Sequence, residues 1–558
     1  PRLVRWLPSV FDGRPSVVLF RATASAGDPA VASTRKVRTE VDGPPLYFVY
    51  SGSTPKFLAV TKTLERAGLV RARDEPVCWS LLWTSQVTAE TLAGFEEHQR
   101  TNHFPGSEVL GRKDLLITQL LTMEQRFPVG YAVSPAGFVL PRDARGWQAS
   151  VEEDPQAVWI WKPCNGRCGN RIALLSPSTS PEDASKVGEL CHKRGVVQRY
   201  IANPLLIDGY KFDLRVYVVV LSYDPLKVYL NTEGLVRLAT QRYTMDSETF
   251  GTKTMHLTNY SINKYSPDFV PNTDRADGAP LAGDGCRPSK WSFQELRQYL
   301  QHHGLDYDAL FARIEDLVIK TLIAADPAIR RASSSPAEGV EAVGANLASH
   351  CFEIYGFDVL VNSKLRPWLL EVNIHPSLRT DSPLDKRIKF QLVADTLNLV
   401  GLRQPRDAAS AGGRGGVRRH PSRRGRDGEH KAGAKDGSVG GATSRLTAAR
   451  LASMSPSSAV AAFTEEAWEI VLDAYDEELR SGGLRRIFPR ENGERYAMYF
   501  DEESFGNVVL RKWHEAGGGN DLLSQQRSHE FCGKAGGGPD ASIMERLPPP
   551  PRSGRRKE

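Results

Sequence analysis

Three oxygen-bearing side chains, Asp358, Glu371 and Asn373, stand among apolar residues. The apolar runs YGFDVLV and WLLEVNI flank the turn-like NSKLRP, which predicts a β-hairpin. A turn centred between Lys364 and Leu365 would place Asp358 directly opposite Glu371, and Asn373 shares a strand face with Glu371. Two carboxylates among apolar neighbours are costly unless a cation neutralises them, and magnesium prefers such oxygen ligands. The pattern therefore favours a metal site over its alternative, a structural carboxylate pair bridged by Lys or Arg.

A second set of charges alternates along the segment KFDLR, which runs into the apolar VYVVV. On a strand, Lys211, Asp213 and Arg215 share one face, whereas Phe212 and Leu214 share the other. Two cations suit phosphate oxygens, and the carboxylate between them suits ribose hydroxyls. A salt-bridged face exposed to solvent explains the alternation equally well, so this segment alone does not decide between the two.

Two further segments carry groups that can bind phosphate, but with less specific patterns. Lys162 ends the strand-like WIWKP, and the following loop CNGRCGNR contains Gly166 and Gly169. A lysine beside such a loop can bind phosphate through charge and backbone N–H groups, although the loop matches neither a Walker A motif nor G-x-G-x-x-G. The segment HLTNYS (256–261) supplies neutral donors and acceptors. An ordinary surface turn explains the first segment better when it is taken alone, and a self-capped turn explains the second equally well.

Apolar periodicity predicts the elements that would position these side chains. Strand patterns occupy 46–50, 79–83, 158–162, 195–201, 213–221, 227–231, 355–361 and 368–374. Helical patterns occupy 56–67, 112–126, 293–303, 308–325, 388–399 and 465–479. Strands and helices intermixed without strict alternation predict an α/β (α+β) fold.

Composition and charge narrow the class of protein. Of the 558 residues, 40% are hydrophobic and 25% charged, which fits a globular chain, and no apolar run is long enough to span a membrane. The 7 cysteines are scattered and odd in number, which favours a reducing compartment over a disulfide framework. The net charge is +6, yet 403–435 alone holds ten Lys or Arg against three Asp or Glu. The folded parts therefore need not bind nucleic acid.

Taken together, these segments resemble the tubulin tyrosine ligase-like family, which has an ATP-grasp core, over about 79–402. The matching motifs, in the family's order, are NHFPGSEVLGRKDLL (102–116), VWIWKP (158–163), VQRYIANPLLIDGYKFDLRVYV (197–218), EGLVRLAT (233–240), MHLTNYSINK (255–264) and YGFDVLVNSKLRPWLLEVNIHPSLRTDSPLD (355–385). Within the family, the chain looks closest to the glutamate-adding branch.

The resemblance implies roles for individual residues. ATP would be bound by Lys162, Gly169, Gln198, Arg199, Tyr200, Ile201, Lys211, Phe212, Asp213, Thr258 and Asn259. Two magnesium ions would be held by Asp358, Glu371 and Asn373, and the incoming glutamate by Arg237, Ser261 and Lys290. Lys211 and Arg215 would act in catalysis, Arg215 by stabilising the developing anion of the intermediate.

One departure from the family's pattern lies in the loop that covers the phosphates, which usually reads K-P-x-x-x-x-R-G-x-G-I. Cys168 stands where Arg is expected, and Arg171 where the second Gly is expected. A shift of one residue would let Arg167 replace the missing Arg. Gly is needed where backbone passes close to phosphate, so Arg171 would narrow the site. Because the metal ligands and the strand charges are intact, an active enzyme with a rearranged loop is favoured over an inactive one.

Composition and the resemblance together divide the chain into six expected segments. These are a poorly ordered N-terminal segment (1–45), the N-terminal domain of the ligase core (46–157), the ATP-grasp central and C-terminal domains (158–402), a disordered Arg/Gly-rich basic linker (403–459), an accessory helical segment (460–515) and a disordered tail (516–558).

The activity expected from the resemblance is ATP- and magnesium-dependent protein glutamylation. An isopeptide bond would form between free L-glutamate and a side-chain carboxylate of tubulin, through an acyl phosphate. A glycylase or tyrosine ligase of the same fold and an inactive, microtubule-binding pseudo-ligase are the alternatives. The chain would act as a monomer in the cytoplasm and on the cytoskeleton, with the cilium or basal body as a further location, and would bind neither nucleic acid nor a membrane. It would contact the acidic tails of tubulin, with 403–435 as either a cationic tether or a plain linker.

Overall fold

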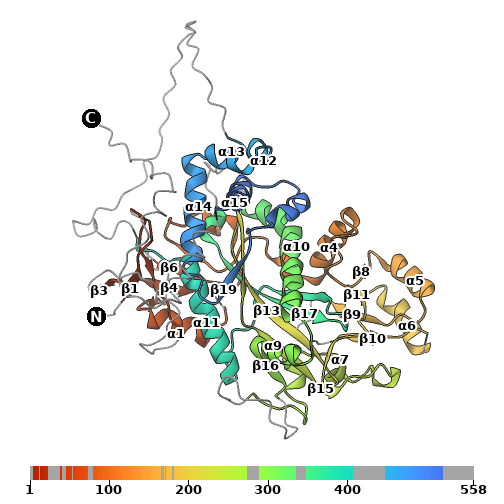
Figure 1. Ribbon diagram of the computed structural model, residues 1–558. Helices are drawn as coiled ribbons and strands as arrows, with labels where there is room; N and C mark the ends of the chain where they lie inside the picture. Colours follow the sequence, from red (N-terminus) through yellow and green to blue (C-terminus); the bar gives the residue numbers. More distant parts are fainter. Residues whose placement is uncertain are drawn as a thin grey trace, which may run out of the picture.

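The computed structural model describes residues 4–11, 13–22, 38–40, 45–52, 54–72, 79–164, 169, 171–178, 181–272, 288–334, 347–405 and 446–518 (Figure 1). These residues form a mixed α/β structure with several sheets, which confirms the predicted fold class. None of their helices combines the length and the apolar character of a membrane span.

An eight-stranded antiparallel sheet forms the centre of the molecule (Figure 1). Its longest strand, β13 (Tyr210–Tyr223), pairs along one edge with β17 (Glu353–Val361). Along the other edge it pairs first with β15 (Leu235–Arg242) and then with β14 (Leu226–Asn231). The sheet is completed by β12 (Leu206–Ile207), β16 (Lys290–Ser292), β18 (Pro367–Asn373) and β19 (Leu484–Phe488).

Because side chains alternate along β13, one face of the central sheet is apolar throughout, and the other is charged at one end of the strand and apolar at the other. The even-numbered residues from Phe212 to Val220 are buried in the larger hydrophobic core with α10 (Tyr307–Ser334). On the opposite face, the odd-numbered residues Lys211–Arg215 are charged, whereas those from Tyr217 to Leu221 lie in a second core with α11 (Pro383–Val400). The charged part of the sheet is therefore the part that the core with α11 does not include.

A smaller antiparallel sheet carries Lys162 and Gln198. Its strands, in spatial order, are β10 (Ala173–Leu175), β9 (Trp159–Pro163), β11 (Gly195–Arg199) and β8 (Gly137–Leu140). The helices α5 (Ala144–Glu153) and α6 (Pro181–Leu190) contribute Trp147, Val187 and Leu190 to the hydrophobic core of this sheet. Packing of Trp147, Trp159 and Trp161 in this core holds β9 and β11, the strands that carry Lys162 and Gln198.

The N-terminal part contains a parallel sheet, in the order β5 (Val70–Arg71), β4 (Tyr47–Tyr50), β6 (Trp79–Trp83) and β7 (Arg100–Thr101), with α1 (Leu58–Arg66) in the same core. The predicted strand at 79–83 has these same bounds in the structure.

The structure differs from the prediction of a poorly ordered segment at 1–45. Two strands, β1 (Val4–Leu7) and β2 (Val17–Val18), pair with each other, and β3 (Arg38–Glu40) pairs with β1. The backbone N–H of Val18 donates to the Leu402 carbonyl at 2.9 Å. Burial of Trp6, Val18 and Phe20 in the core with α11 explains the difference, because tertiary contacts order a segment that has only weak local signals.

The remaining helices of the core are α2 (Ala89–Ala93), α3 (Glu108–Gly111), α4 (Lys113–Arg126), α7 (Lys253–His256), α8 (Tyr260–Asn263) and α9 (Phe293–His302). The helix predicted at 308–325 is longer in the structure, where α10 continues through Pro327 to Ser334. Proline removes a backbone donor and usually ends or kinks a helix, which is why the prediction stopped short of it. Ile329 and Ser333 are buried beyond Pro327, so packing outweighs that cost.

A C-terminal block, residues 446–518, adds a strand to the central sheet. β19 pairs with β14, and α12 (Ala448–Ala452), α13 (Pro456–Ala461), α14 (Glu465–Glu478) and α15 (Phe505–Glu515) share a small apolar core (Figure 1). The structure differs here from the prediction of a disordered linker over 403–459, since α12 and much of α13 fall within it. Residues 406–445, with most of the basic segment, and 519–558 lie outside the described residues.

Glu315 of α10 connects the C-terminal block to the core. Its buried carboxylate forms ion pairs with Arg485 and Arg490. Replacing both arginines by alanine should lower the free energy of unfolding by about 3 kcal/mol, because Glu315 would keep a buried charge without these partners. Urea denaturation measures this loss. Adding Glu315→Gln to the double variant should restore most of the stability, and an unchanged loss would contradict the ion-pair explanation.

Candidate active site

Two rows of charged residues cross one face of the central sheet. In the first row, Lys290 of β16 lies opposite Arg237 of β15, and Arg237 lies opposite Asp213 of β13. Residues directly opposite on neighbouring strands share a face, so the three side chains emerge together. Arg237 Nε donates to Asp213 Oδ1 at 2.7 Å, and both residues are buried.

The second row begins two residues further along β13, on the same face. Arg215 lies opposite Asp358 of β17, and Asp358 lies opposite Glu371 of β18. Arg215 Nε donates to Asp358 Oδ1 at 2.6 Å. Arg237 Nη2 is 2.8 Å from Asp358 Oδ2 and thereby joins the two rows. The sequence segments that carry these charges are far apart, but the sheet brings them to one place.

In the hairpin of β17 and β18, Asp358 lies opposite Glu371 as predicted, although the turn centre and the strand register differ from the prediction. The pairing of Val361 with Pro367 centres the turn on Lys364, half a residue earlier than expected. A bulge after Asp358 then shifts the register so that Asp358 still faces Glu371. Asn373 is also close, because its Nδ2 atom lies 3.4 Å from Glu371 Oε1. The three expected metal ligands therefore lie side by side.

Basic side chains hold both carboxylates, as the alternative explanation from the sequence requires. Besides the two arginines on Asp358, Lys113 Nζ lies 2.8 Å from Glu371 Oε2. Burial alone would raise the pKa of Asp358, but Arg215 and Arg237 together lower it well below its ordinary value. Asp358 is thus a fully ionised carboxylate in a buried setting, which is the state that a divalent cation also requires.

The donor set fits magnesium only when a ligand supplies further oxygens. Within the described ranges, no three His, Cys, Asp or Glu residues are grouped so that they could hold a metal ion. Asp358, Glu371 and Asn373 offer two carboxylates and one amide. Magnesium is commonly held by one or two carboxylates together with phosphate oxygens and water, rather than by an all-protein cage. The residues therefore fit a metal that arrives with a phosphate ligand.

Two buried lysines face the site with neutral hydrogen-bond partners. Lys162 Nζ donates to Gln198 Oε1 at 2.9 Å, and burial lowers the pKa of Lys162 to about 8. Lys211 Nζ donates to Tyr200 Oη at 2.8 Å and to the His256 carbonyl at 2.9 Å, and burial lowers its pKa to about 7. Among the described residues, neither ammonium group forms an ion pair with a carboxylate. Two buried cations in this condition suit an anionic ligand such as a polyphosphate.

The strand expected to line the adenine pocket contributes alternate side chains. Gln198 and Tyr200 are buried, and Ile201 is partly buried. The Arg199 side chain points away and forms an ion pair with Asp154 on the surface. Its backbone N–H, which donates to the Ala136 carbonyl at 2.8 Å, is already used within the sheet. The structure thus differs from the prediction for the Arg199 side chain, because successive strand residues face opposite ways.

Phe212 also departs from its expected place. It is fully buried in the larger hydrophobic core, on the face opposite Lys211 and Asp213. Its neighbours in sequence carry the charges, so Phe212 supports the strand without reaching a ligand on the charged face.

The three residues expected to bind glutamate lie near one another. Lys290 Nζ donates to Asp385 Oδ2 at 2.7 Å and lies 4.2 Å from the centre of the Tyr260 ring. Ser261 follows Tyr260 in α8, and Arg237 is the cross-strand neighbour of Lys290. Two neighbouring cations, with Ser261 one residue after the Tyr260 ring that Lys290 contacts, form a setting that suits a dicarboxylic amino acid.

Comparisons with known proteins identify the family of the chain. The model of the tubulin-tyrosine ligase family matches residues 92–410. The chain belongs to the tubulin-tyrosine ligase family. It is 32% identical over 466 residues to tubulin monoglutamylase TTLL4 of Homo sapiens, covering 82% of this chain and 36% of that protein. It is 35% identical over 457 residues to tubulin polyglutamylase TTLL5 of Mus musculus, covering 81% of this chain and 33% of that protein.

A third relative is tubulin polyglutamylase ttll6 of Danio rerio, which is 34% identical over 453 residues, with 80% of this chain and 51% of that protein covered. The chain therefore spans about a third to a half of the length of these curated relatives.

The residue that departs from the family's phosphate-loop pattern also has an unusual backbone conformation. Arg171, which replaces the family's second glycine, has φ +60°, the left-handed conformation that favours glycine. Gly169 has φ +73°, and a Cβ atom there would lie 2.6 Å from Ile262 Cδ1 and 3.0 Å from Asn259 Oδ1. Gly169 and Arg171 thus both have a backbone conformation that favours glycine, and Gly169 packs closely on Asn259, which the resemblance places near the phosphates beside the buried Thr258. Residues 165–168, including Cys168, and residue 170 lie outside the described residues.

Lys113 is a residue at the site that sequence reasoning missed. It is the first residue of α4, and its ion pair with Glu371 brings it to the carboxylate pair. It belongs to the motif NHFPGSEVLGRKDLL, which carries part of the family resemblance but to which no chemistry was assigned. The signal that could have pointed to it is its position at a predicted helix start, where backbone N–H groups and a lysine together favour anions.

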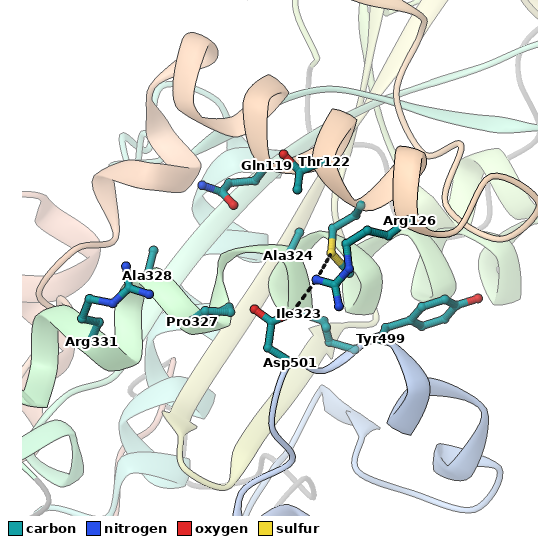
Figure 2. Close-up of a pocket in the computed structure, with 11 residues that line it drawn as sticks. Gln119, Thr122, Arg126, Ile323, Ala324, Pro327, Ala328, Arg331, Tyr499 and Asp501 are labelled. Carbon is teal, nitrogen blue, oxygen red and sulfur yellow. Dashed lines mark hydrogen bonds and ion pairs between the residues drawn. The ribbon is translucent and has the colours of Figure 1, made fainter.

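A small pocket between α4, α10 and the segment 499–501 is separate from this charged face. Figure 2 shows Arg126 of α4 bridging to Asp501, with Ala324 and Pro327 of α10 beside them. The distance between Arg126 Nη1 and Asp501 Oδ1 is 2.5 Å. None of the residues that line this pocket belongs to the two charged rows.

Proposed function

We propose that this chain contains an ATP- and magnesium-dependent ligase that joins free L-glutamate to a side-chain carboxylate of tubulin. The observation that carries the proposal is the pair of buried lysines, Lys162 and Lys211, facing a carboxylate pair on a strongly charged sheet. Several relatives are named tubulin monoglutamylase or polyglutamylase, which supports the choice of substrate. The cytoskeleton is then the place where the protein acts.

ATP and magnesium would bind on the charged face. Asp358, Glu371 and Asn373 would hold up to two metal ions, whose charge would stabilise the phosphoryl group during its transfer. Lys162 and Lys211 would hold phosphate oxygens, while Asp213 would hold the ribose. Gln198 and Tyr200 would line the adenine site from β11 and its C-terminal end.

The chemistry needs no covalent nucleophile from the protein. The substrate carboxylate would attack the terminal phosphorus of ATP, forming an acyl phosphate and releasing ADP. The amine of free glutamate would then attack the acyl carbon. An isopeptide bond forms, phosphate leaves, and the amine releases one proton. Arg215 lies beside Asp358 and would stabilise the negative charge that develops during these steps.

Arg237 and Lys290 would select an acidic amino acid. The two cations are cross-strand neighbours on β15 and β16, and Ser261 lies on α8 next to Tyr260, whose ring Lys290 contacts. A glycylase or tyrosine ligase of the same fold remains the alternative, and offering labelled glutamate, glycine and tyrosine to one preparation separates these specificities.

The ion pairs on Asp358 favour a second candidate, a pseudo-ligase that binds microtubules without catalysing transfer. Two arginines already neutralise Asp358, so a metal ion must compete with them. Magnesium-dependent ATP binding, measured by calorimetry, would be absent in a pseudo-ligase of this kind.

Mass spectrometry of tubulin tails tests the proposed function directly. Incubation with the protein, ATP, magnesium and glutamate should add glutamate residues to the tails. Omission of ATP or of magnesium should prevent the addition, and tails that remain unmodified in the complete mixture would contradict the proposal.

The buried lysines make ATP binding depend on pH. The pKa of Lys211 is about 7 in the structure, so at pH 8 the amine is mostly neutral. Phosphate anions favour the charged form, so ATP binding at pH 8 should take up protons, and affinity should fall as pH rises above 7. Calorimetry in buffers of different ionisation enthalpy measures this uptake. Lys211→Met should show a smaller uptake, and an equal uptake in the variant would contradict the role of Lys211.

A further inference from the structure

The motif NHFPG (102–106) carries part of the family resemblance, yet the proposed chemistry gives it no task. Its segment lies along the start of β17. Thr101 forms an isolated bridge with Cys351, and Phe352 N donates to the Thr101 carbonyl at 3.0 Å. The motif therefore reaches the open end of the hairpin that carries Asp358 and Glu371.

A buried carboxylate fixes His103 at this end of the hairpin. Glu353, the first residue of β17, is completely buried, and His103 Nδ1 lies 2.7 Å from its Oε1 atom. The second carboxylate oxygen accepts the Phe104 N–H at 3.0 Å and the Tyr355 hydroxyl at 3.1 Å. With hydrogen bonds to both oxygens, Glu353 gives the His103 ring one well-defined orientation.

The His103 ring supports the turn that follows the metal-ligand strand. Its partner is the exposed ring of His375, two residues after Asn373, with ring centres 4.6 Å apart and planes at 77°. Edge-to-face contacts of this kind are favourable and restrict the orientation of both rings. The contact therefore ties the exit of β18 to the buried base of β17.

The next residue, Pro376, leads from this turn to Arg215. A Cβ atom on Gly356 would lie 3.0 Å from Pro376 Cβ, 3.1 Å from Arg215 Cδ and 3.3 Å from Arg215 Nε. Pro376 and the Arg215 side chain thus both lie close to Gly356. Asp358 is two residues further along β17. Pro376 is buried, and it lies on the same side of Gly356 as the Arg215 side chain, whose guanidinium group bonds to Asp358.

We infer that His375, held by the His103–Glu353 pair, is a positioning residue that keeps Arg215 against Asp358 through Pro376. The inference rests on the proposed function, because it gives Arg215 its place in the transfer step. His375 itself is assigned no contact with a substrate. A misplacement of about 1 Å at a reacting group can cost about 100-fold in rate, so a surface ring can matter to turnover.

The test compares two substitutions of His375 in the full chain. His375→Ala removes the ring and should lower kcat for glutamate incorporation by about 10-fold or more, with KM for ATP and for glutamate changed by less than about twofold. His375→Phe keeps an aromatic ring without its nitrogens and should restore most of kcat. Because His375 is exposed, both variants should melt within about 2 °C of the parent protein.

His302→Ala is the matched control. His302, the last residue of α9, is also exposed and contacts the next residue, His303, with ring centres 5.2 Å apart. This control should keep the parent kcat.

The outcomes separate the inference from the proposed function. A parent protein that incorporates no glutamate removes the proposed function. An active parent with an unchanged kcat in His375→Ala overturns the positioning role. Failure of His375→Phe to restore kcat also overturns it, because the ring nitrogens would then matter more than the packing. Parallel losses of ATP affinity and melting temperature in His375→Ala would indicate a structural role and overturn it as well.

Discussion

Glu371→Gln should lower ATP-dependent glutamate incorporation by at least about 1000-fold, which corresponds to about 4 kcal/mol of transition-state stabilisation. The substitution keeps the size of the side chain but removes one of the two carboxylates that face each other across β17 and β18. It should also raise the magnesium concentration needed for ATP binding, because the remaining ligands carry less charge. Calorimetric titration of ATP at several magnesium concentrations measures this second effect.

Lys113→Gln is the control that distinguishes a metal ligand from a salt-bridge partner. Both substitutions break the ion pair between Lys113 and Glu371, but only Glu371→Gln removes a carboxylate. The lysine variant should therefore keep the magnesium dependence of the parent, whatever its effect on rate. If the two variants depend on magnesium in the same way, Glu371 is a structural partner of Lys113, and the metal assignment fails.

Lys290→Ala should raise KM for glutamate about 30-fold, since loss of one charge-assisted hydrogen bond costs about 2 kcal/mol. Lys290 lies beside Arg237 on the adjoining strand, where the side-chain carboxylate of an acidic amino acid would bind. ATP affinity should change little, because Lys162 and Lys211 remain. Initial rates measured over a range of glutamate concentrations, with ATP saturating, provide the test.

Lys389→Ala is the matched control for this prediction. Lys290 and Lys389 are both buried and both form ion pairs with Asp385, at 2.7 and 2.8 Å. Lys389 donates also to the Arg379 carbonyl and is not a neighbour of Arg237 across the strands. Its variant should lose stability but keep KM for glutamate within about threefold. Equal increases of KM in the two variants would show that both act through Asp385 alone.

The sequence allowed the central part of the site to be predicted because its signals are local. Alternating residues in KFDLR and the two apolar runs around NSKLRP specify strands, and strand geometry then places Asp358 opposite Glu371. The bulge after Asp358 was not visible in the sequence, yet it offset the error in the predicted turn centre. The same alternation explains why the Arg199 and Phe212 side chains point away from the charged face. The roles implied by the family resemblance included both residues because they take no account of this alternation.

Most features of the site and fold that could not be predicted from the sequence depend on contacts between distant segments. Lys113 reaches Glu371 across more than half of the ligase core, and no pattern within α4 indicates that partner. The two arginines on Asp358 come from different strands, so the competition for this carboxylate appears only in the fold. The first strands of the chain are likewise ordered by contacts with α11, a segment from near the end of the core.

The pairing of β19 with β14 bears on where the folded unit around the central sheet ends. The family match stops at residue 410, but the strand that covers one margin of the central sheet comes from residues 484–488. Without it, β14 would offer a row of free backbone donors and acceptors to any other extended chain, including a second copy of the same protein. The C-terminal block thus supplies a strand that covers this edge, and we expect the chain to aggregate more readily when that strand, which lies beyond the family match, is removed.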